Sequence, residues 1–160
     1  MNSNITALTG RKVIVTGGAG FIGSHLCEEL VAIGADVISM DDLSAGKDSN
    51  VTLFAGKSNF RFTHKDICDN DAEMKELFAG VDTVFHNAAS KKNICLDNPQ
   101  RDLDVNAGGV LNLLRHAMDA GVRKFVHAST GSVYGEPQIF PTTEEHPLAP
   151  ASYYGVSKLA

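Results

Sequence analysis

Short apolar runs alternate with amphipathic stretches along the first part of the chain. The run KVIVTG (12–17) is rich in β-branched residues and ends at glycine, which is typical of a buried strand. The segment 21–33 then repeats apolar residues every three or four positions, which predicts one face of a helix. The residues on this face are Ile22, Leu26, Leu30 and Ile33. Gly34 predicts the end of the helix, and ADVISMDD (35–42) predicts a second strand.

The same alternation continues through the rest of the chain. Three further strands are predicted by FRFTHKD (60–66), VDTVFHNAA (81–89) and RKFVHAS (123–129). NDAEMKELFAG (70–80) predicts a helix that stops at Gly80, and the polar segment 44–58 predicts a loop with one short helix. A long helix is expected over Asp102–Gly121. Its apolar stripe consists of Val105, Leu111, Leu114 and Met118. A proline-rich loop follows Tyr134, and a last helix begins near Ser152.

Strands that are separated by helices form βαβ units, and such units build a parallel sheet with helices on both faces. The sequence therefore predicts an α/β fold, a doubly wound parallel sheet of the Rossmann type. A chain of 160 residues is long enough to bury about 70% of its unfolded surface. We expect one domain over 1–160.

Composition and charge narrow the class of protein. The net charge of −5 and the pI near 5.6 argue against a nucleic-acid surface, which needs clustered Lys and Arg. No apolar run reaches the roughly 20 residues that cross a bilayer, and the first residues lack the apolar core of a secretory signal. The three cysteines lie far apart without metal-ligand spacing. A soluble cytoplasmic protein without a metal site is expected.

A glycine-rich loop follows the first predicted strand. TGGAGFIG (16–23) carries glycines at 17, 20 and 23 and leads directly into the first predicted helix. Gly17 permits a tight turn, Gly20 lets the backbone approach a pyrophosphate, and Gly23 lets the helix pack closely. The N-terminus of the helix offers unpaired N–H groups and a partial positive charge to phosphates. The loop therefore predicts a dinucleotide site.

An acidic residue closes the second predicted strand. The carboxylate of Asp41 is placed to accept hydrogen bonds from the ribose hydroxyls of an adenosine, and Asp42 beside it either shares this contact or is a solvated turn residue. A carboxylate repels a 2′-phosphate, and no arginine is expected nearby to receive one. NAD is therefore favoured over NADP.

The segment SYYGVSKLA (152–160) contains two adjacent tyrosines and one lysine. Tyr154 and Lys158 are four residues apart and share a helix face, whereas Tyr153 is matched by the uncharged Ser157. A phenol with a pKa near 10 is a poor base at neutral pH, but a neighbouring ammonium lowers that pKa. Tyr154 and Lys158 therefore form a candidate proton-transfer pair.

These motifs occur together with HKDI (64–67) and HASTGSVYGEP (127–137). The combination, from Lys12 to Ala160, resembles the extended short-chain dehydrogenase/reductase family, in particular its NAD-dependent nucleotide-sugar epimerases and dehydratases. The resemblance implies an active-site threonine, Thr130, an acid/base, Tyr154, and a lysine, Lys158, that tunes the phenol and binds the nicotinamide ribose.

The resemblance also implies a set of residues that bind the cofactor. Those at the pyrophosphate would be Gly17, Gly20, Phe21, Ile22 and Gly23. Those at the adenosine would be Asp41, Asp42, Leu43, Ser44, Asp66 and Ile67. Ala88 and Ala89 would pass under the cofactor, and Lys91 would reach its phosphates or ribose. Other side chains, including His86, His127 and Asn106, are expected to have structural roles.

The resemblance leaves several reactions open. Dehydratases of this family usually place an Asp-Glu pair directly after the catalytic threonine, where this chain has Gly131 and Ser132. Dehydration is therefore disfavoured, and 4-epimerisation of a UDP-sugar through a 4-keto intermediate is favoured. A reductase or decarboxylase of the same family is the main enzymatic alternative.

Family members are about twice as long as this chain, which implies a truncated protein without the C-terminal substrate subdomain. A catalytically silent dinucleotide-binding module is thus a second hypothesis. A nucleotide sugar is the expected substrate. The helix predicted over Asp102–Gly121 often contributes to dimer bundles in this family, so a homodimer is among the expected assemblies.

Overall fold

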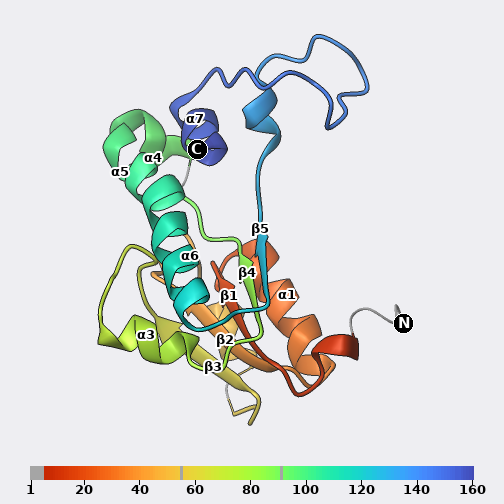
Figure 1. Ribbon diagram of the computed structural model, residues 1–160, viewed down its shortest axis with the longest axis vertical. Coiled ribbons are helices and arrows are strands. Elements are labelled where there is room, and N and C mark those ends of the chain that lie inside the picture. The colour runs from red at the N-terminus through yellow and green to blue at the C-terminus, as the bar shows by residue number, and fades with distance from the viewer. Residues whose placement is uncertain (1–5, 55, 91) are drawn as a thin grey trace.

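The computed structural model describes residues 6–54, 56–90 and 92–160 and contains one five-stranded parallel sheet (Figure 1). The strands lie in the order β3-β2-β1-β4-β5. Their bounds are Lys12–Thr16 for β1, Asp36–Asp41 for β2, Phe60–His64 for β3, Thr83–His86 for β4 and Lys124–His127 for β5. All neighbouring pairs are parallel, which confirms the doubly wound α/β fold.

The strand order reverses between β1 and β4. After β3 the chain returns past β2 and β1, and β4 pairs with the free side of β1 in the register Val15 to Phe85. The loops that leave β1 and β4 therefore diverge at the carboxyl edge of the sheet. In open α/β sheets this switch point is where ligands bind.

The strand residues alternate between two hydrophobic layers because successive side chains point to opposite faces. One layer joins Val13, Val15 and Val37 to Cys27 and Leu30 of α1 (Phe21–Ala32). The short helix α2 (Ser49–Thr52) follows the second strand on its way to β3.

The second layer joins Ile14, Met40 and Val84 to α3 (Ala72–Phe78) and α6 (Val110–Asp119). Helix α1 thus covers one face of the sheet, and α3 and α6 cover the other (Figure 1).

The buried face of α1 differs from the prediction by part of a turn. Ile22 is 65% exposed, and the buried residues of the helix are Gly23, Cys27 and Leu30. A Cβ added to Gly23 would lie 2.1 Å from the carbonyl oxygen of Gly17, so the helix backbone itself packs on the glycine loop. This close approach turns Ile22 outward.

The helix predicted over Asp102–Gly121 is three segments. Helix α5 (Pro99–Leu103) leads into a π-helical segment, η2 (Asp104–Gly109), and then into α6. A short helix α4 (Lys92–Asp97), which the sequence analysis did not predict, precedes them.

The π-helical segment changes the phase of the apolar stripe because its hydrogen bonds span one residue more than those of an α-helix. Val105 is buried, but Leu111, Leu114 and Met118 are exposed. Leu113 and Ala117 face the sheet in their place. The single stripe predicted for this helix was therefore wrong.

The remaining elements are short. A 3₁₀ turn, η1 (Thr6–Leu8), precedes the sheet, and another, η3 (Gly131–Tyr134), follows β5. After the proline-rich loop comes α7 (Tyr153–Leu159), which begins where the Ser152 hydroxyl accepts a hydrogen bond from the Gly155 amide at 3.0 Å. Helix α7 packs beside α4 and α5 (Figure 1). Within the described ranges, no helix has the length and apolar character needed to cross a membrane.

We predict that Gly23→Ala destabilises the protein by about 1–3 kcal/mol, because the new Cβ would meet only backbone atoms, none of which can rotate away. Gly108→Ala is the matched control, since a Cβ there would meet nothing within 4 Å, and alanine gains up to about 1 kcal/mol over glycine in a helix. Urea unfolding of the three proteins measures the difference. Equal midpoints for Gly23→Ala and the unmodified protein would contradict the close packing.

Candidate functional site

Two cavities lie at the carboxyl edge of the sheet and share the wall formed by Gly17, Gly20, Asn87 and Ala89. The acidic cavity, as we call it, extends from this wall over the ends of β2 and β3 to Arg101 on α5. The tyrosine cavity extends the other way, past the first turn of α1, to Tyr154 and Lys158 on α7.

The shared wall owes its shape to glycines. Gly17 has a positive φ of 68°, and a Cβ there would lie 2.8 Å from the Ala88 amide nitrogen. The Gly20 amide donates to the Gly17 carbonyl at 3.0 Å, which closes a tight turn. A Cβ on Gly20 would meet only that carbonyl, at 3.1 Å, and Gly20 lines both cavities. A side chain at Gly20 would therefore occupy space that is now open to a ligand.

The first turn of α1 borders this wall without a side-chain cap. Its N-cap is Gly20, and Phe21 and Ile22 are largely exposed as they line the tyrosine cavity. The N-terminus of a twelve-residue helix directs amide N–H groups and a partial positive charge outward. Anionic groups are stabilised at such a position.

Asp41 lies at the end of β2 with only 7% of its surface exposed. Its carboxylate accepts hydrogen bonds from the amides of Ala19, at 3.0 Å, and Leu43, at 2.8 Å. Burial raises the pKa of Asp41, although both amides act to lower it. Leu43 adopts a positive φ of 57°, so the chain turns sharply directly after the amide that binds the carboxylate. The polypeptide after β2 is thereby wrapped around one acidic group.

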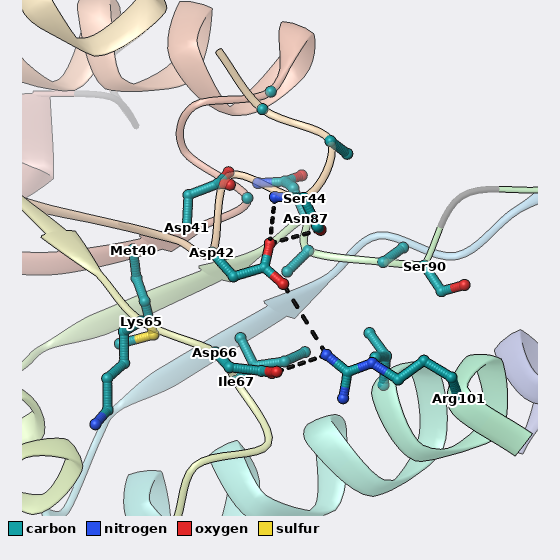
Figure 2. Close-up of a pocket in the computed structure, with 17 residues that line it drawn as sticks. Met40, Asp41, Asp42, Ser44, Lys65, Asp66, Ile67, Asn87, Ser90 and Arg101 are labelled. Carbon is teal, nitrogen blue, oxygen red and sulfur yellow. Dashed lines mark hydrogen bonds and ion pairs between the residues drawn. The ribbon is translucent and has the colours of Figure 1, made fainter. Parts of the chain in front are cut away.

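Asp42 points into the acidic cavity (Figure 2). Its Oδ1 accepts hydrogen bonds from the amide and hydroxyl of Ser44, at 3.0 and 2.6 Å. The Asp42 carboxylate is thus part of the cavity wall.

Arg101 is the charged residue that the sequence analysis missed. It comes from α5, yet its guanidinium lies 2.5 Å from the Asp66 carboxylate and 4.0 Å from that of Asp42 (Figure 2). Burial favours a higher pKa for Asp66, but the Cys68 amide and the guanidinium outweigh it and lower the pKa. The expectation that no arginine lies nearby was therefore wrong, since Arg101 approaches Asp42, the residue after Asp41. It was missed because α5 lies far from β2 in the sequence.

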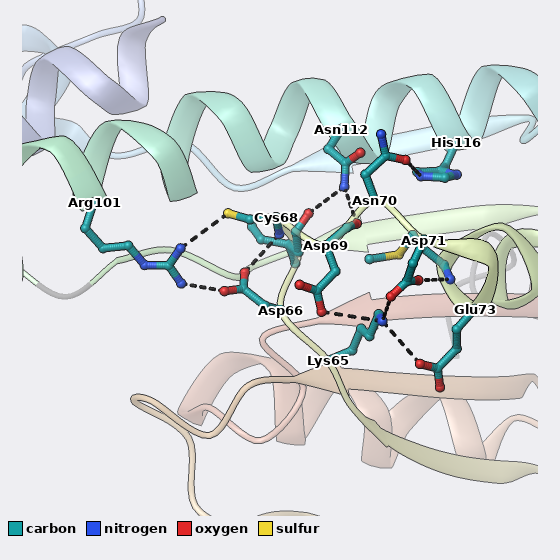
Figure 3. Close-up of polar contacts among 12 residues, drawn as sticks. Lys65, Asp66, Cys68, Asp69, Asn70, Asp71, Glu73, Arg101, Asn112 and His116 are labelled. Atoms are coloured by element: carbon teal, nitrogen blue, oxygen red, sulfur yellow. Dashed lines mark hydrogen bonds and ion pairs between the residues drawn. The ribbon is translucent and has the colours of Figure 1, made fainter.

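Lys65 also lines the acidic cavity, but its ammonium binds a group of carboxylates outside the cavity. It contacts Asp69 at 3.4 Å and Glu73 at 3.2 Å, and it donates a short hydrogen bond to Asp71 (Figure 3). The hydrogen bond to Asp71, with further support from Glu73 and Asp69, raises the pKa of Lys65 despite the cost of burial. Since this lysine is neutralised elsewhere, Arg101 is, among the described residues, the cation that faces the carboxylates of Asp41, Asp42 and Asp66 in the cavity.

Tyr154 and Lys158 both line the tyrosine cavity, whereas Tyr153 is 60% exposed and does not. Thr130 caps η3, where its hydroxyl accepts from the Ser132 amide at 3.2 Å, and its interaction with the Tyr154 phenol acts to lower the pKa of that phenol. The structure therefore brings together the three residues of the predicted proton-transfer site.

The electrostatics of this pair differ from the prediction. Burial raises the pKa of Tyr154, the hydrogen bond from Thr130 lowers it, and the charges of Asp102 and Cys95 raise it further. Burial likewise lowers the pKa of Lys158, opposed by Asp102. The spacing to Lys158 predicted a lowered pKa for Tyr154, but the pKa is raised instead. Burial is the largest cause, and it outweighs the lowering by Thr130.

Two histidines lie beneath Lys158. His127 Nε2 is 3.5 Å from the Lys158 Nζ, and its ring stacks on that of His86 at 5.1 Å. His86 is buried with its Nδ1 2.6 Å from the Thr16 hydroxyl, and burial lowers its pKa to about 3. Both rings therefore stay neutral at physiological pH; His86 is a packed residue, whereas His127 is exposed at the end of β5.

Most of the predicted site residues line one of the two cavities. Those in the acidic cavity are Gly17, Gly20, Asp41, Asp42, Ser44, Asp66, Ile67, Ala88 and Ala89. Those in the tyrosine cavity are Gly17, Gly20, Phe21, Ile22, Gly23, Ala89, Tyr154 and Lys158. Leu43 and Thr130 line neither cavity, and Lys91 lies outside the described residues.

Sequence reasoning missed several lining residues, namely Met40, Ala45, Gly46, Lys65, Asn87, Ser90, Arg101, Val105, Ala128 and Ser129. Of these, Asn87 and Ser129 could have been found, because each is among the last three residues of a predicted strand and follows the end of the observed one. Among the described residues no group of three or more His, Cys, Asp or Glu side chains could hold a metal ion.

Comparison with known proteins agrees with this geometry. Residues 13–160 match the model of the NAD-dependent epimerase/dehydratase family. The UDP-glucose 4-epimerase of Mycolicibacterium smegmatis is 42% identical over 155 residues, which cover 93% of this chain and 48% of that protein.

Two solved structures share the fold closely. The epimerase Mth375 of Methanothermobacter thermautotrophicus superimposes with a TM-score of 0.89 at 38% identity, covering 97% of this chain and 46% of the other. The dTDP-glucose 4,6-dehydratase of Streptomyces venezuelae, solved with NAD bound, gives 0.86 at 38% identity, covering 92% and 48%. This chain thus spans about half the length of the relatives that it matches, and it belongs to the NAD-dependent epimerase/dehydratase family.

Proposed function

We propose that this chain binds NAD across its two cavities and that, in its full-length form, the protein epimerises a nucleotide sugar at C4. The wall shared by both cavities, Gly17 and Gly20 at the N-terminus of α1, is the observation that carries the proposal. A pyrophosphate fits an uncapped helix N-terminus beside glycines that leave open space. The two halves of a dinucleotide would then extend in opposite directions, one to Asp41 and the other to Tyr154.

The charges of the acidic cavity support NAD over NADP. The Asp41 carboxylate is held by two amides and retains lone pairs for ribose hydroxyls. Arg101 is already shared between Asp66 and Asp42, so its charge is balanced before a ligand arrives. A 2′-phosphate would meet an excess of carboxylate, which repels it.

NAD, when bound, supplies a reversible hydride acceptor. In the proposal the residues of this chain handle the proton. The Tyr154 phenol exchanges a proton with the 4-hydroxyl of the sugar, and Thr130 contributes a hydrogen bond at that oxygen. Lys158 holds a positive charge next to the phenol. If the 4-keto sugar then rotates within the site, it presents the opposite face of C4. Return of the hydride to that face would invert C4.

The two residues after Thr130 favour epimerisation over dehydration. Elimination of water requires an acid and a base at the sugar, but Gly131 and Ser132 offer no carboxylate. The next acidic side chain along the chain is the exposed Glu136. UDP is the proposed nucleotide because the Mycolicibacterium relative is a UDP-glucose 4-epimerase.

A second candidate is a dinucleotide-binding module without turnover. Both cofactor cavities and the proton-transfer pair lie within residues that span about half of the relatives' length, 48% for the Mycolicibacterium enzyme. A homodimer through the exposed residues of α6, Leu111, Leu114 and Met118, is compatible with either candidate. Binding and turnover therefore have to be measured separately.

We predict that Asp41→Asn weakens NAD binding by about tenfold or more, because a hydrogen bond to a charged group contributes about 1.5–3 kcal/mol. Asp36→Asn is the control, since Asp36 is an exposed aspartate at the other end of the same strand. Isothermal titration calorimetry with NAD and NADP measures both. Equal weakening by the two variants, or preference of the unmodified chain for NADP, would contradict the proposed site.

We predict that the protein interconverts UDP-glucose and UDP-galactose and that Tyr154→Phe slows this about 10²–10⁴-fold, the usual contribution of a general acid–base. Tyr153→Phe should retain the rate, because its ring lies outside the cavity. Sugar analysis of the product is the measurement. Loss of water from the sugar would refute the epimerase assignment, and NAD binding without any turnover would favour the module.

We predict that the Tyr154 phenol ionises above the ordinary tyrosine pKa of about 10, since burial raises its pKa. The chain has three tyrosines and no tryptophan, so ultraviolet pH titration resolves phenolate formation well. The difference between the unmodified protein and Tyr154→Phe isolates this phenol. A midpoint below 10 would show that lysine, rather than burial, controls Tyr154.

A further inference from the structure

Four polar side chains from four segments meet in one buried cluster beside the tyrosine cavity. They are Ser90 after β4, Asp102 on α5, Asn106 in the π-helical segment and Ser157 on α7. Their exposed fractions are 9, 0, 2 and 3%, respectively. The cluster therefore joins the strand edge to the helix that carries Tyr154 and Lys158.

The hydrogen bonds of this cluster converge on the Asp102 carboxylate. Its Oδ1 accepts from the Ser90 hydroxyl at 2.8 Å and from the Asn106 amide at 3.1 Å, and its Oδ2 accepts from the Ser157 hydroxyl at 2.5 Å. The Asn106 side chain closes the network by donating to the Ser157 oxygen at 2.9 Å and accepting from the Ser90 amide at 2.9 Å.

These contacts stabilise α7, a helix that is too short to be stable without tertiary contacts. Helix α7 has seven residues, well below the length at which an isolated helix is stable in water. Ser157 lies directly before Lys158, and its hydroxyl oxygen is 3.1 Å from the Tyr154 carbonyl oxygen. The hydrogen bond from Ser157 to Asp102 therefore fixes the turn that carries both side chains. Rotation of α7 about its axis would break the bond to Asp102.

The cluster also contains a buried negative charge, the Asp102 carboxylate, which its hydrogen bonds alone do not explain. Asp102 has no exposed surface, and in the described part of the chain it forms no ion pair within 4 Å. A buried carboxylate bound only by neutral donors is costly, and an asparagine could make most of the same contacts. The nearby Lys158, which is only 7% exposed, is the cation that benefits from this charge.

We propose that Asp102 is a positioning residue of the proton-transfer site: through Ser157 it fixes the orientation of Tyr154 and Lys158, and its charge supports the buried Lys158 ammonium. The inference rests on the proposed function, because it concerns the same pair. It goes beyond that function by assigning a role to a residue that lines neither cavity.

Several titratable groups surround Tyr154 and Lys158 and affect the pKa that the experiment measures. Tyr154 and Lys158 lie on α7, Asp102 faces them from α5, Cys95 from α4, and His127 from β5. Both histidines beneath Lys158 are neutral at physiological pH, as their lowered pKa values indicate. Asp102 raises the pKa of Tyr154 and of Lys158, so its removal acts on both in the same direction.

The experiment uses the 160-residue chain and Asp102→Asn, each titrated in the ultraviolet with and without Tyr154→Phe. We expect Asp102→Asn to lower the Tyr154 midpoint by several tenths to about one pH unit, as loss of a nearby negative charge does. Asp104→Asn is the matched control, because Asp104 is an exposed aspartate of the next segment. An unchanged midpoint in Asp102→Asn, or an equal change in Asp104→Asn, would overturn the proposal.

Ser157→Ala separates orientation from charge and covers the case in which Asp102→Asn does not fold. It removes the anchor but leaves the carboxylate. We expect the Tyr154 midpoint to move less than in Asp102→Asn, while accessibility of the phenol to a tyrosine-nitrating reagent rises severalfold over the unmodified chain. Unaltered reactivity in folded Ser157→Ala would refute the positioning role. Calorimetry with NAD on the unmodified chain is independent of these readouts, so failure of the proposed function is recognised separately.

Discussion

The close approach of two backbones at the glycine loop is the constraint on which the site depends. Helix α1 reaches the sheet edge only because Gly23 brings its first turn against the Gly17 carbonyl, and Gly17 in turn lies against the Ala88 amide. These contacts hold the loops after β1 and β4 together at the point where the strand order reverses. They leave the N-terminus of α1 uncapped and facing both cavities. A bulkier residue at either glycine would separate the elements that define the dinucleotide site.

Around this wall the charges are arranged in two different ways. On the acidic side of the described structure, aspartates outnumber the single guanidinium of Arg101 that faces them, while the ammonium of Lys65 is held by three carboxylates outside the cavity. On the tyrosine side, an ammonium and a phenol lie above two neutral imidazoles and near one buried carboxylate. The first arrangement suits hydroxyl groups, which donate hydrogen bonds. The second suits a proton that moves between two oxygens.

Much of this could be predicted from the sequence because it is local. The strands, the glycine loop and the Tyr154–Lys158 spacing each depend on residues within one or two turns of one another. Arg101 and Asp102 could not be found that way, since their partners Asp66 and Ser157 lie far along the chain. The buried face of α6 was misassigned because a π-helical segment shifts its phase, and no simple periodicity reports such a shift. The pKa of Tyr154 was misjudged because spacing reveals a neighbouring charge but not the degree of burial.

The raised pKa of Tyr154 also bears on how such a site would operate. Burial disfavours the phenolate, so the phenol alone is a proton donor rather than a base. Burial also lowers the pKa of the Lys158 ammonium, and the charge of Asp102 opposes that change. A positive charge entering the tyrosine cavity would shift the balance toward phenolate, and the oxidised nicotinamide ring carries one. We therefore expect the basicity of Tyr154 to depend on what fills the cavity, so that proton removal is coupled to the presence of the hydride acceptor.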